Sequence, residues 1–322
     1  MINYVYNPQA LKNTYNSTLI SGEEDEKLEA EYRKMFKDDL IIKDGGFTAY
    51  SKSPSGIELS KGCQACKNGK WLCIFVGYNC NLQCPFCPQP KAPNFVHVFD
   101  DKNLTSHGTL SEVKYFLSSD NIIEGVSYSG GEPFLYLDKV LNIASFINQK
   151  RPELYQWIYT NGVLVDEEKL KKLSDVGINE IRFDLAATKF SREIIDKIPL
   201  AKKYINRVTV EIPAIPQIRV LMENNLLDEL VSMGLSQLNI SEMNIAQEIN
   251  METFGKNTVL VGHKGYFKGL SLLESKEIYY EILKYVLDKK LDILVNNCNS
   301  GAKFVQIMNK ERCQNVYSSG SV

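Results

Sequence analysis

Three cysteines stand close together at a spacing that suits an inorganic cluster. The sequence from 77 to 88 is GYNCNLQCPFCP, in which Cys80, Cys84 and Cys87 follow the pattern C-x3-C-x2-C. An apolar run at 72–76 precedes it and is typical of a buried strand. Thiolates on such a short loop can face one iron–sulfur cluster, and three ligands for a four-iron cube leave one iron open. The alternative is a structural zinc loop, but zinc sites favour paired C-x2-C knuckles and four protein ligands.

A second motif follows another apolar run. The sequence from 126 to 133 is VSYSGGEP. Gly130 and Gly131 allow a backbone to approach a ligand closely and to adopt positive φ. The carboxylate of Glu132 can accept a hydrogen bond from an ammonium group. The motif therefore predicts a ligand-binding turn at the end of a strand.

Together, the two motifs resemble those of the radical S-adenosylmethionine (SAM) enzymes. In that superfamily the open iron takes the amino and carboxylate groups of SAM, and Phe86 matches the aromatic position before the third cysteine. The Gly-Gly-Glu-Pro motif of the superfamily holds the SAM amino group, which assigns that role to Ser129, Gly130, Gly131 and Glu132. The resemblance implies a [4Fe–4S] cluster and SAM as cofactors.

The composition narrows the function classes. The chain has 322 residues, enough for one barrel-sized domain with extensions, and its net charge of −2 gives no basic surface for nucleic acid. No apolar run approaches the ~20 residues of a membrane span, and the first residues lack the pattern of a signal peptide. Eight cysteines in such a chain favour metal or redox roles over disulfides. We therefore expect a cytoplasmic protein that binds neither nucleic acid nor membranes.

From residue 72 onward, strand-like apolar runs alternate with helical patterns. The alternation indicates a parallel sheet with right-handed crossovers. Six such units match the partial (β/α)6 barrel of the radical SAM family, an α/β fold whose functional groups lie at the carboxyl ends of the strands. The resemblance covers about residues 60–300. We expect strands at 72–78, 123–129, 155–160, 180–185, 207–212 and 237–241.

Extensions flank the expected barrel. We divide the chain into an N-terminal accessory segment (1–60), a barrel core (61–245) and a C-terminal part (246–322). The first segment shows a helical pattern and then, from 43 to 61, a loop rich in Gly, Ser and Pro. The last part contains a long loop or hairpin whose aromatic residues could cover the mouth of the barrel, a closing helix, a final strand and a C-terminal helix.

Polar residues follow the expected strands. They resemble the strand ends in the branch that includes the pyruvate formate-lyase activating enzyme, where such side chains line the SAM ribose and the substrate. By this resemblance we expect Asn161 and Asp184 near SAM, and Glu211 and Glu242 on the SAM or substrate side. The alternative for each is a strand-end side chain that caps the next helix or bonds to a loop.

The other five cysteines suggest a second site. Cys63 and Cys66 form a C-x2-C knuckle, which is half of a metal site. A helix over 301–312 would be ~18 Å long and would keep Cys298 and Cys313 too far apart to share a metal. Cys73 lies only seven residues after Cys66. We therefore expect one four-sulfur site made by Cys63, Cys66, Cys73 and Cys298.

The expected second site also resembles a branch of the superfamily related to activating enzymes. That branch has a Gly-Cys-x-x-Cys motif before the first strand and a cysteine near its C-terminal end. The site would hold an auxiliary iron–sulfur cluster, or a single iron or zinc ion. Cys313 then remains outside both sites, either as a structural residue or as a hydrogen-atom donor to a substrate radical.

The resemblance implies the following chemistry. One electron from the reduced cluster cleaves SAM to methionine and a 5′-deoxyadenosyl radical, which takes a hydrogen atom from a substrate. We expect the substrate to be a peptide or protein modified after translation, and the electron donor to be of the flavodoxin or ferredoxin type. One alternative is a glycyl-radical-enzyme activating enzyme. The other is an iron–sulfur binding or electron-transfer protein, against which the intact Gly-Gly-Glu-Pro motif argues because an electron carrier needs no pocket for the SAM amino group.

Overall fold

The larger of two sheets forms the body of the molecule. The computed structural model describes residues 18–20, 22–43, 48–89, 110–118, 122–245, 247–254, 258–263, 266–272 and 274–313. In this part of the chain, a nine-stranded sheet has the order β2-β3-β12-β9-β8-β7-β6-β5-β4, and a three-stranded sheet has the order β1-β10-β11.

Parallel pairing runs through the larger sheet from β4 to β12. The predicted strands are all present, which confirms the α/β class and the partial (β/α)6 barrel, and β12 adds a further parallel strand that the sequence also predicted. The parallel strands are β4 (Trp71–Phe75), β5 (Gly125–Ser129), β6 (Tyr155–Thr160), β7 (Glu180–Phe183), β8 (Arg207–Ala214), β9 (Gln237–Glu242) and β12 (Leu294–Cys298).

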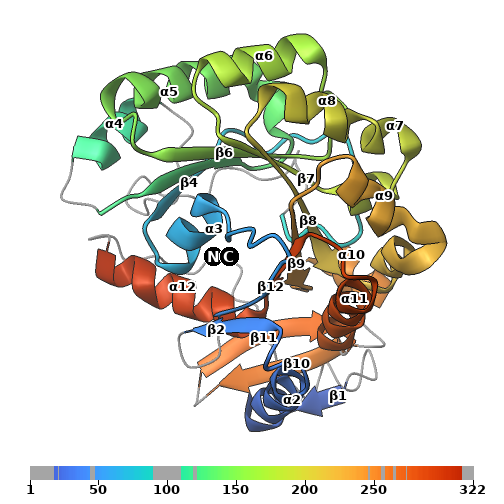
Figure 1. The fold of residues 1–322 in the computed structure, drawn as a ribbon. Helices are drawn as coiled ribbons and strands as arrows, with labels where there is room; N and C mark the ends of the chain where they lie inside the picture. The colour runs from blue at the N-terminus through green and yellow to red at the C-terminus, as the bar shows by residue number, and fades with distance from the viewer. Residues whose placement is uncertain are drawn as a thin grey trace.

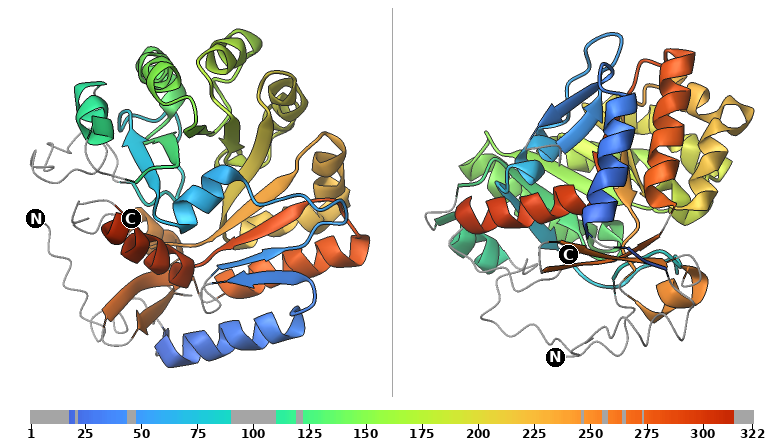
Figure 2. Two further views of the ribbon diagram at one scale, coloured as in Figure 1. Left: turned by 60° about the vertical axis from the view of Figure 1, so that its left-hand side comes forward. Right: turned by 90° about the horizontal axis from the view of Figure 1, so that it is seen from below.

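Helices cover the outer side of this curved sheet (Figures 1 and 2). Local sequence explains how they form. At α6, for example, the Asp166 side chain accepts a hydrogen bond from Lys169 N, while Leu170 and Leu173 are fully buried. The outer helices that follow the parallel strands are α4 (Leu110–Ser118), α5 (Leu137–Lys150), α6 (Glu167–Asp175), α7 (Arg192–Ile195), α8 (Lys197–Tyr204) and α9 (Leu226–Ser232).

One short helix, α3 (Lys61–Lys67), lies on the opposite side, in the space around which the sheet curves (Figures 1 and 2). The Ser60 hydroxyl begins the helix by accepting a hydrogen bond from Cys63 N at 3.0 Å. A Cβ added at Gly62 would lie 2.7 Å from Arg182 Nη2 on β7. Glycine is therefore required for α3 to pack this closely against the inner side of the barrel.

The N-terminal segment shares the main sheet. Its helix α2 (Gly22–Met35) precedes β2 (Leu40–Lys43) and β3 (Thr48–Ser51), and β3 pairs antiparallel with β12. Our prediction of a loop over 43–61 was wrong at β3, where all four residues are buried. The prediction failed because a four-residue strand is too short to show periodicity, and its pairing with the distant β12 is not visible in the local sequence.

The C-terminal part contains α10 (Glu248–Phe254), β10 (Thr258–His263), β11 (Tyr266–Leu272), α11 (Ser275–Lys289) and α12 (Ser300–Cys313). β10 and β11 pair antiparallel, as the predicted hairpin requires, and β1 (Thr18–Ile20) pairs with β10. The aromatic side chains that we expected over the mouth lie outside the described side chains, as does that of Cys313. No helix in the described ranges combines the length and hydropathy that crossing a membrane demands.

Candidate active site

The loop that carries Cys80, Cys84 and Cys87 leaves the carboxyl end of β4 and is tied to the Gly-Gly-Glu turn after β5. Backbone hydrogen bonds join the two segments and continue the pairing of β4 with β5. They run from Val76 N to Ser129 O (3.0 Å), from Gly131 N to Gly77 O (2.8 Å) and from Glu132 N to Asn79 O (2.9 Å). The two sequence motifs therefore form one continuous backbone surface.

Neither glycine of the turn has room for a side chain. Gly130 has a φ of 124°, and an added Cβ would lie 2.2 Å from the carbonyl oxygen of Gly77. At Gly131 an added Cβ would lie 2.1 Å from the carbonyl oxygen of Asn79. Both contacts are with backbone, which cannot rotate away as a side chain can. The close approach of the two motifs therefore requires glycine at both positions.

Tyr136 supports the start of the cysteine loop from the side of the short helix η2 (Pro133–Tyr136). Its hydroxyl oxygen accepts a hydrogen bond from Asn79 N at 3.0 Å. Its ring packs so closely that a Cβ at Gly77 would lie 2.1 Å from Cζ. The sequence analysis missed this residue, because a tyrosine just after the Gly-Gly-Glu-Pro motif carries no chemical signal of its own.

Glu132 joins the ends of β5 and β6. Its side chain is buried, Oε1 accepts hydrogen bonds from Phe134 N (3.1 Å) and Thr160 Oγ1 (2.9 Å), and Oε2 accepts one from Asn161 N (2.8 Å). Burial raises the pKa of the carboxyl group, although these hydrogen bonds oppose the rise. A carboxylate has about four acceptor positions, so three bonds leave one for a further donor.

Asn161 connects the end of β6 to the cysteine loop. Its Nδ2 donates a hydrogen bond to Asn81 Oδ1 at 2.7 Å and lies 3.8 Å from Cys80 Sγ. Its Oδ1 accepts a hydrogen bond from Val163 N at 3.0 Å, which fixes the orientation of the amide. Asn161 thus lies between the first cysteine of the loop and the Glu132 carboxylate.

The cysteine loop has the donor chemistry of a cluster site. Cys80 is exposed, Cys84 and Cys87 are half-buried, and none of the cysteines in the described ranges forms a disulfide. Among the described residues, no three His, Cys, Asp or Glu side chains converge in a metal-binding arrangement. The fit of a cluster here therefore rests on three thiols, the ligands that iron–sulfur clusters take, on one anchored loop.

Residues 74–220 match the sequence model of the radical SAM superfamily. This range includes the cysteine loop, the Gly-Gly-Glu turn and strands β5 to β8. The chain contains a radical SAM domain. The family implies a [4Fe–4S] cluster and SAM as cofactors, and the match indicates an enzyme.

Two curated relatives support the assignment of the radical SAM domain. MJ0021 of Methanocaldococcus jannaschii, whose name places it provisionally among the glycyl-radical enzyme activating enzymes, is 29% identical over 280 residues. That match spans 80% of this chain and 69% of the relative. A cysteine-type anaerobic sulfatase-maturating enzyme of Clostridium perfringens is 32% identical over 107 residues, which are 30% of this chain and 27% of that protein.

Solved structures of radical SAM enzymes also match the fold. SuiB of Streptococcus suis bound to S-adenosylmethionine is 14% identical with a TM-score of 0.46, over 77% of this chain and 55% of SuiB. The sulfatase-maturating structure anSMEcpe with bound AdoMet is 17% identical with a TM-score of 0.42, over 68% of this chain and 57% of that one. With both TM-scores below 0.5, the assignment of the domain rests on the sequence matches.

Three further predicted cofactor residues lie at or near the strand ends of the radical SAM domain. Phe86 is buried in the main core, and Ser129 ends β5 half-buried. Asp184 follows β7 and accepts a hydrogen bond from Ala187 N at 3.2 Å, so it caps the short helix η3 (Leu185–Thr188). Burial raises the pKa of Asp184 to about 7 against two backbone hydrogen bonds. Contact of these residues with SAM stays a prediction.

Glu242, another predicted cofactor residue, is buried at the end of β9. Both of its carboxylate oxygens lie 3.3 Å from Lys276 Nζ, and Oε2 also accepts a hydrogen bond from Ser300 N at the start of α12. Burial alone would raise the pKa of Glu242, but Lys276 and the Ser300 amide outweigh it and hold the pKa at about 2. These are the helix-capping contacts that we weighed as the alternative, and its role beside SAM or substrate stays untested.

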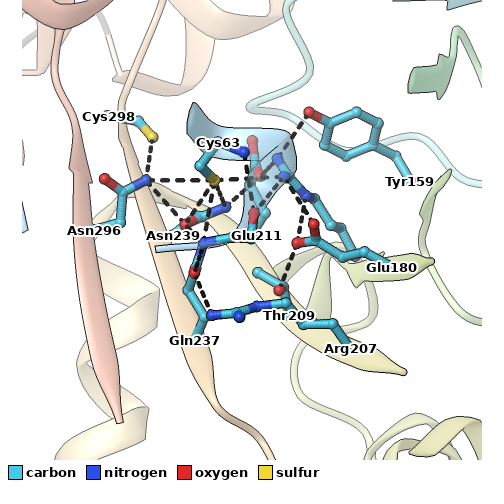
Figure 3. Close-up of polar contacts among 12 residues, drawn as sticks. Cys63, Tyr159, Glu180, Arg207, Thr209, Glu211, Gln237, Asn239, Asn296 and Cys298 are labelled. Atoms are coloured by element: carbon cyan, nitrogen blue, oxygen red, sulfur yellow. Dashed lines mark hydrogen bonds and ion pairs between the residues drawn. The ribbon is translucent and has the colours of Figure 1, made fainter. Parts of the chain in front are cut away.

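Glu211, the remaining carboxylate, lies within β8 rather than at its end. Its Oε2 accepts hydrogen bonds from Arg182 Nη1 (2.9 Å) and from Asn239 Nδ2 (2.8 Å). Arg182 also forms an ion pair with Glu180 at 2.9 Å and lies over the ring of Trp157 (Figure 3). Glu211 therefore belongs to a polar network inside the barrel, deeper than the strand ends.

Cys63, on the inner helix α3, lies in the same network (Figure 3). Its thiol is buried, and the donors around its sulfur are Gln237 Nε2 (3.2 Å), Arg182 Nη2 (3.4 Å) and Asn239 Nδ2 (3.4 Å). Asn296 Nδ2 lies 3.9 Å from Cys63 Sγ and 3.1 Å from Cys298 Sγ. The two cysteines, far apart in sequence, thus border the same amide.

The structure brings Cys66 to the same place. Burial raises the pKa of the Cys66 thiol, and nearby Cys63 and Cys298 raise it further. Burial likewise raises the pKa of Cys298 to about 12. Cys73 lies on β4 in register with Ser127, and its participation stays a prediction.

The sequence analysis did not assign functions to Arg182, Gln237, Asn239 or Asn296. One signal was present, since Glu180 and Arg182 alternate with apolar residues in a predicted parallel strand, where both faces are normally apolar. Polar residues two apart in such a strand point to the same side. This signal indicates a polar barrel interior, but it does not identify the partners across strands.

Proposed function

We propose that the radical SAM domain cleaves SAM reductively and abstracts a hydrogen atom from a peptide or protein substrate. The observation that carries this proposal is the backbone junction between the cysteine loop and the Gly-Gly-Glu turn. The junction places three thiols beside a turn that can approach a ligand closely. It lies at the carboxyl edge of a parallel sheet, where such folds bind their ligands.

Individual side chains support a division of roles. Cys80, Cys84 and Cys87 would hold the cluster, and Glu132 has an acceptor position left for the SAM ammonium group. When bound, the cluster supplies one electron, and cleavage of the sulfonium bond yields methionine and a 5′-deoxyadenosyl radical. The chain itself would orient SAM, with Asn161 linking the loop to the turn.

The relatives favour a protein substrate. The names of MJ0021 and of the Clostridium perfringens enzyme describe an activating enzyme and a maturating enzyme, both of which would act on proteins. Our leading proposal is a peptide modified after translation. The second candidate is activation of a glycyl-radical enzyme, which the long match to MJ0021 favours. We further propose a flavodoxin- or ferredoxin-type electron donor and a cytoplasmic location.

The substrate proposal can be tested by offering both kinds of partner. Anaerobically reconstituted protein with SAM and dithionite should form 5′-deoxyadenosine together with a mass or stereochemical change in a peptide encoded beside its gene. A glycyl radical detected by electron paramagnetic resonance in a large encoded partner, with the peptide unchanged, would select the activating role. If neither partner raises 5′-deoxyadenosine formation above the level without substrate, the protein-substrate proposal is wrong.

We also propose that Cys63, Cys66, Cys73 and Cys298 hold a second metal centre, an auxiliary iron–sulfur cluster or a single iron or zinc ion. N–H donors around Cys63 support this, because hydrogen bonds to ligating sulfurs are typical of such centres. In addition, within the described residues the buried Oδ1 of Asn296 has no hydrogen-bond partner, although it lies on the side chain that borders both thiols.

Metal analysis tests this second centre. The C80A/C84A/C87A variant should keep the metal of the second site, and its iron, sulfide and zinc content would identify the centre. Adding C63A and C66A should remove that metal, because two of the proposed ligands are lost. If all the residual metal is retained after these substitutions, the second centre does not exist at this place.

A further inference from the structure

A buried amide on α10 contacts the cysteine loop. Asn250 is fully buried, and its Nδ2 donates hydrogen bonds to Pro85 O at 2.7 Å and Cys87 O at 3.1 Å. Its Oδ1 accepts a hydrogen bond from Gln247 N at 2.8 Å. Every polar atom of this side chain is therefore used, and both donors point to the part of the loop that carries the last two cysteines.

The rest of α10 is fixed to the body of the protein. Met251 and Phe254 are buried in the main core, so the helix is a firm base for the Asn250 side chain. Gln247 adds a weaker contact from the same turn, with its Nε2 donating to Pro88 O at 3.0 Å. The segment from 85 to 88 thus receives three hydrogen bonds from two neighbouring side chains.

The loop has little internal support in this region. Pro85 and Pro88 have no N–H group, so they cannot donate backbone hydrogen bonds. Cys87 N does bond to Cys84 O at 3.2 Å, which closes one tight turn around Phe86. The carbonyl groups of the turn are bonded from outside, by α10. Movement of the loop away from α10 would leave the buried Asn250 donors without partners, which costs free energy.

We infer that Asn250 is a positioning residue that clamps the cysteine loop and thereby holds Cys84 and Cys87 in place for the cluster. This inference rests on the proposed function of that loop. α10 lies outside residues 74–220, the range that matches the superfamily, so the clamp comes from a part of the chain that the match does not cover. A cluster held by only three thiols depends strongly on the position of each.

The chain offers a graded set of variants. Asn250→Asp keeps the size of the side chain and the acceptor for Gln247 N, but turns oxygen toward two carbonyl groups. Asn250→Ala removes the clamp altogether. Gln247→Ala removes only the contact with Pro88. Thr253→Ala is the matched control, because this exposed residue of α10 bonds only to Ile249 O in its own helix, at 2.8 Å.

The measurement is made on anaerobically reconstituted full-length protein. The signal of the SAM-binding cluster is followed by electron paramagnetic resonance, since its change on addition of SAM separates it from metal elsewhere. In N250D and N250A we expect release of this cluster to a chelator to be about 10-fold faster, as is typical when groups that orient metal ligands are lost. Their signals should also change shape. Q247A should show a smaller acceleration, and T253A should match the wild type.

Thermal unfolding of the same proteins without metal separates positioning from general stability. N250A that unfolds at a lower temperature but shows an unchanged signal and release rate would overturn the inference, as would N250D and N250A that behave like T253A. A wild-type protein that takes up no such cluster would overturn the proposed function and this inference together. A loaded wild type with unaffected variants would overturn the inference alone.

Discussion

The contact between Gly131 and the carbonyl oxygen of Asn79 determines how closely the two motifs approach. A Cβ at Gly131 would lie 2.1 Å from that oxygen, and the groups it would meet belong to the backbone. By contrast, Gly56 also has positive φ, at 75°, but an added Cβ would meet nothing within 4 Å. The two glycines therefore separate the effect of close approach from that of backbone conformation.

We predict that Gly131→Ala abolishes SAM cleavage and lowers SAM affinity, because the turn can no longer pair with the cysteine loop. Gly56→Ala should cost only about 1 kcal/mol of stability from its positive φ and leave activity intact. Binding of SAM and formation of 5′-deoxyadenosine by the two variants provide the check. Equal activity of G131A and G56A would show that the junction does not shape the SAM site.

At the scale of elements, Glu242 holds three segments together. It ends β9, pairs with Lys276 on α11 and accepts a hydrogen bond from the first amide of α12. Lys276 is also 3.8 Å from Glu29 on α2, so the N-terminal helix joins the same buried group of charges. An anionic side chain at the start of α12 also complements the helix dipole.

We predict that Glu242→Gln destabilises the protein by about 3 kcal/mol near neutral pH, because Lys276 loses its buried partner. The folded-state pKa is lowered to about 2, below the ordinary value of 4.5, so the contribution is fully present above about pH 4.5. It should disappear as the pH falls toward 2. Urea unfolding of wild type and variant across this range measures the difference.

Glu153→Gln is the control for this prediction, because Glu153 pairs with Arg151 at the surface, where such pairs contribute less than about 1 kcal/mol. If the stability difference between E242Q and the wild type does not shrink on acidification, the carboxylate is not the stabilising group.

The elements differ in how far sequence determines them. Strands such as β6 and helices such as α5 follow from local periodicity and were predicted nearly residue by residue. β3 was missed because four residues carry no period, and its partner β12 is distant in sequence. For the site, the cysteine and glycine motifs were visible because their residue types carry chemistry. The amide of Asn250 was not, since only tertiary structure brings it to the loop.

At the scale of the whole molecule, the barrel interior around α3 is polar. Arg182 lies between Glu180 and Glu211 and donates toward Cys63, while its guanidinium group lies 5.0 Å from the centre of the Trp157 ring. This network anchors the inner helix, because the same guanidinium also contacts Ser60 at 3.2 Å. The interior thus replaces part of an apolar core with paired charges.

We predict that Arg182→Met destabilises the protein by about 3–5 kcal/mol, because two carboxylates lose a buried partner. Arg192→Ala, which removes surface pairs with Asp196 and Glu229, should cost less than about 1 kcal/mol. Urea unfolding compares the two, and the accessibility of Cys63 to a thiol reagent reports whether α3 is displaced. Similar stability of both variants would mean that the buried network is not what holds α3.

The central claim, that the cysteine loop supports reductive cleavage of SAM, has one direct test. Wild-type protein, reconstituted with iron and sulfide under anaerobic conditions and reduced with dithionite, is incubated with SAM, and 5′-deoxyadenosine is quantified. We predict clear formation by the wild type. The C80A/C84A/C87A variant, shown by circular dichroism to be folded, should give none above the background without protein. Formation of 5′-deoxyadenosine by that variant at the wild-type rate would contradict the account.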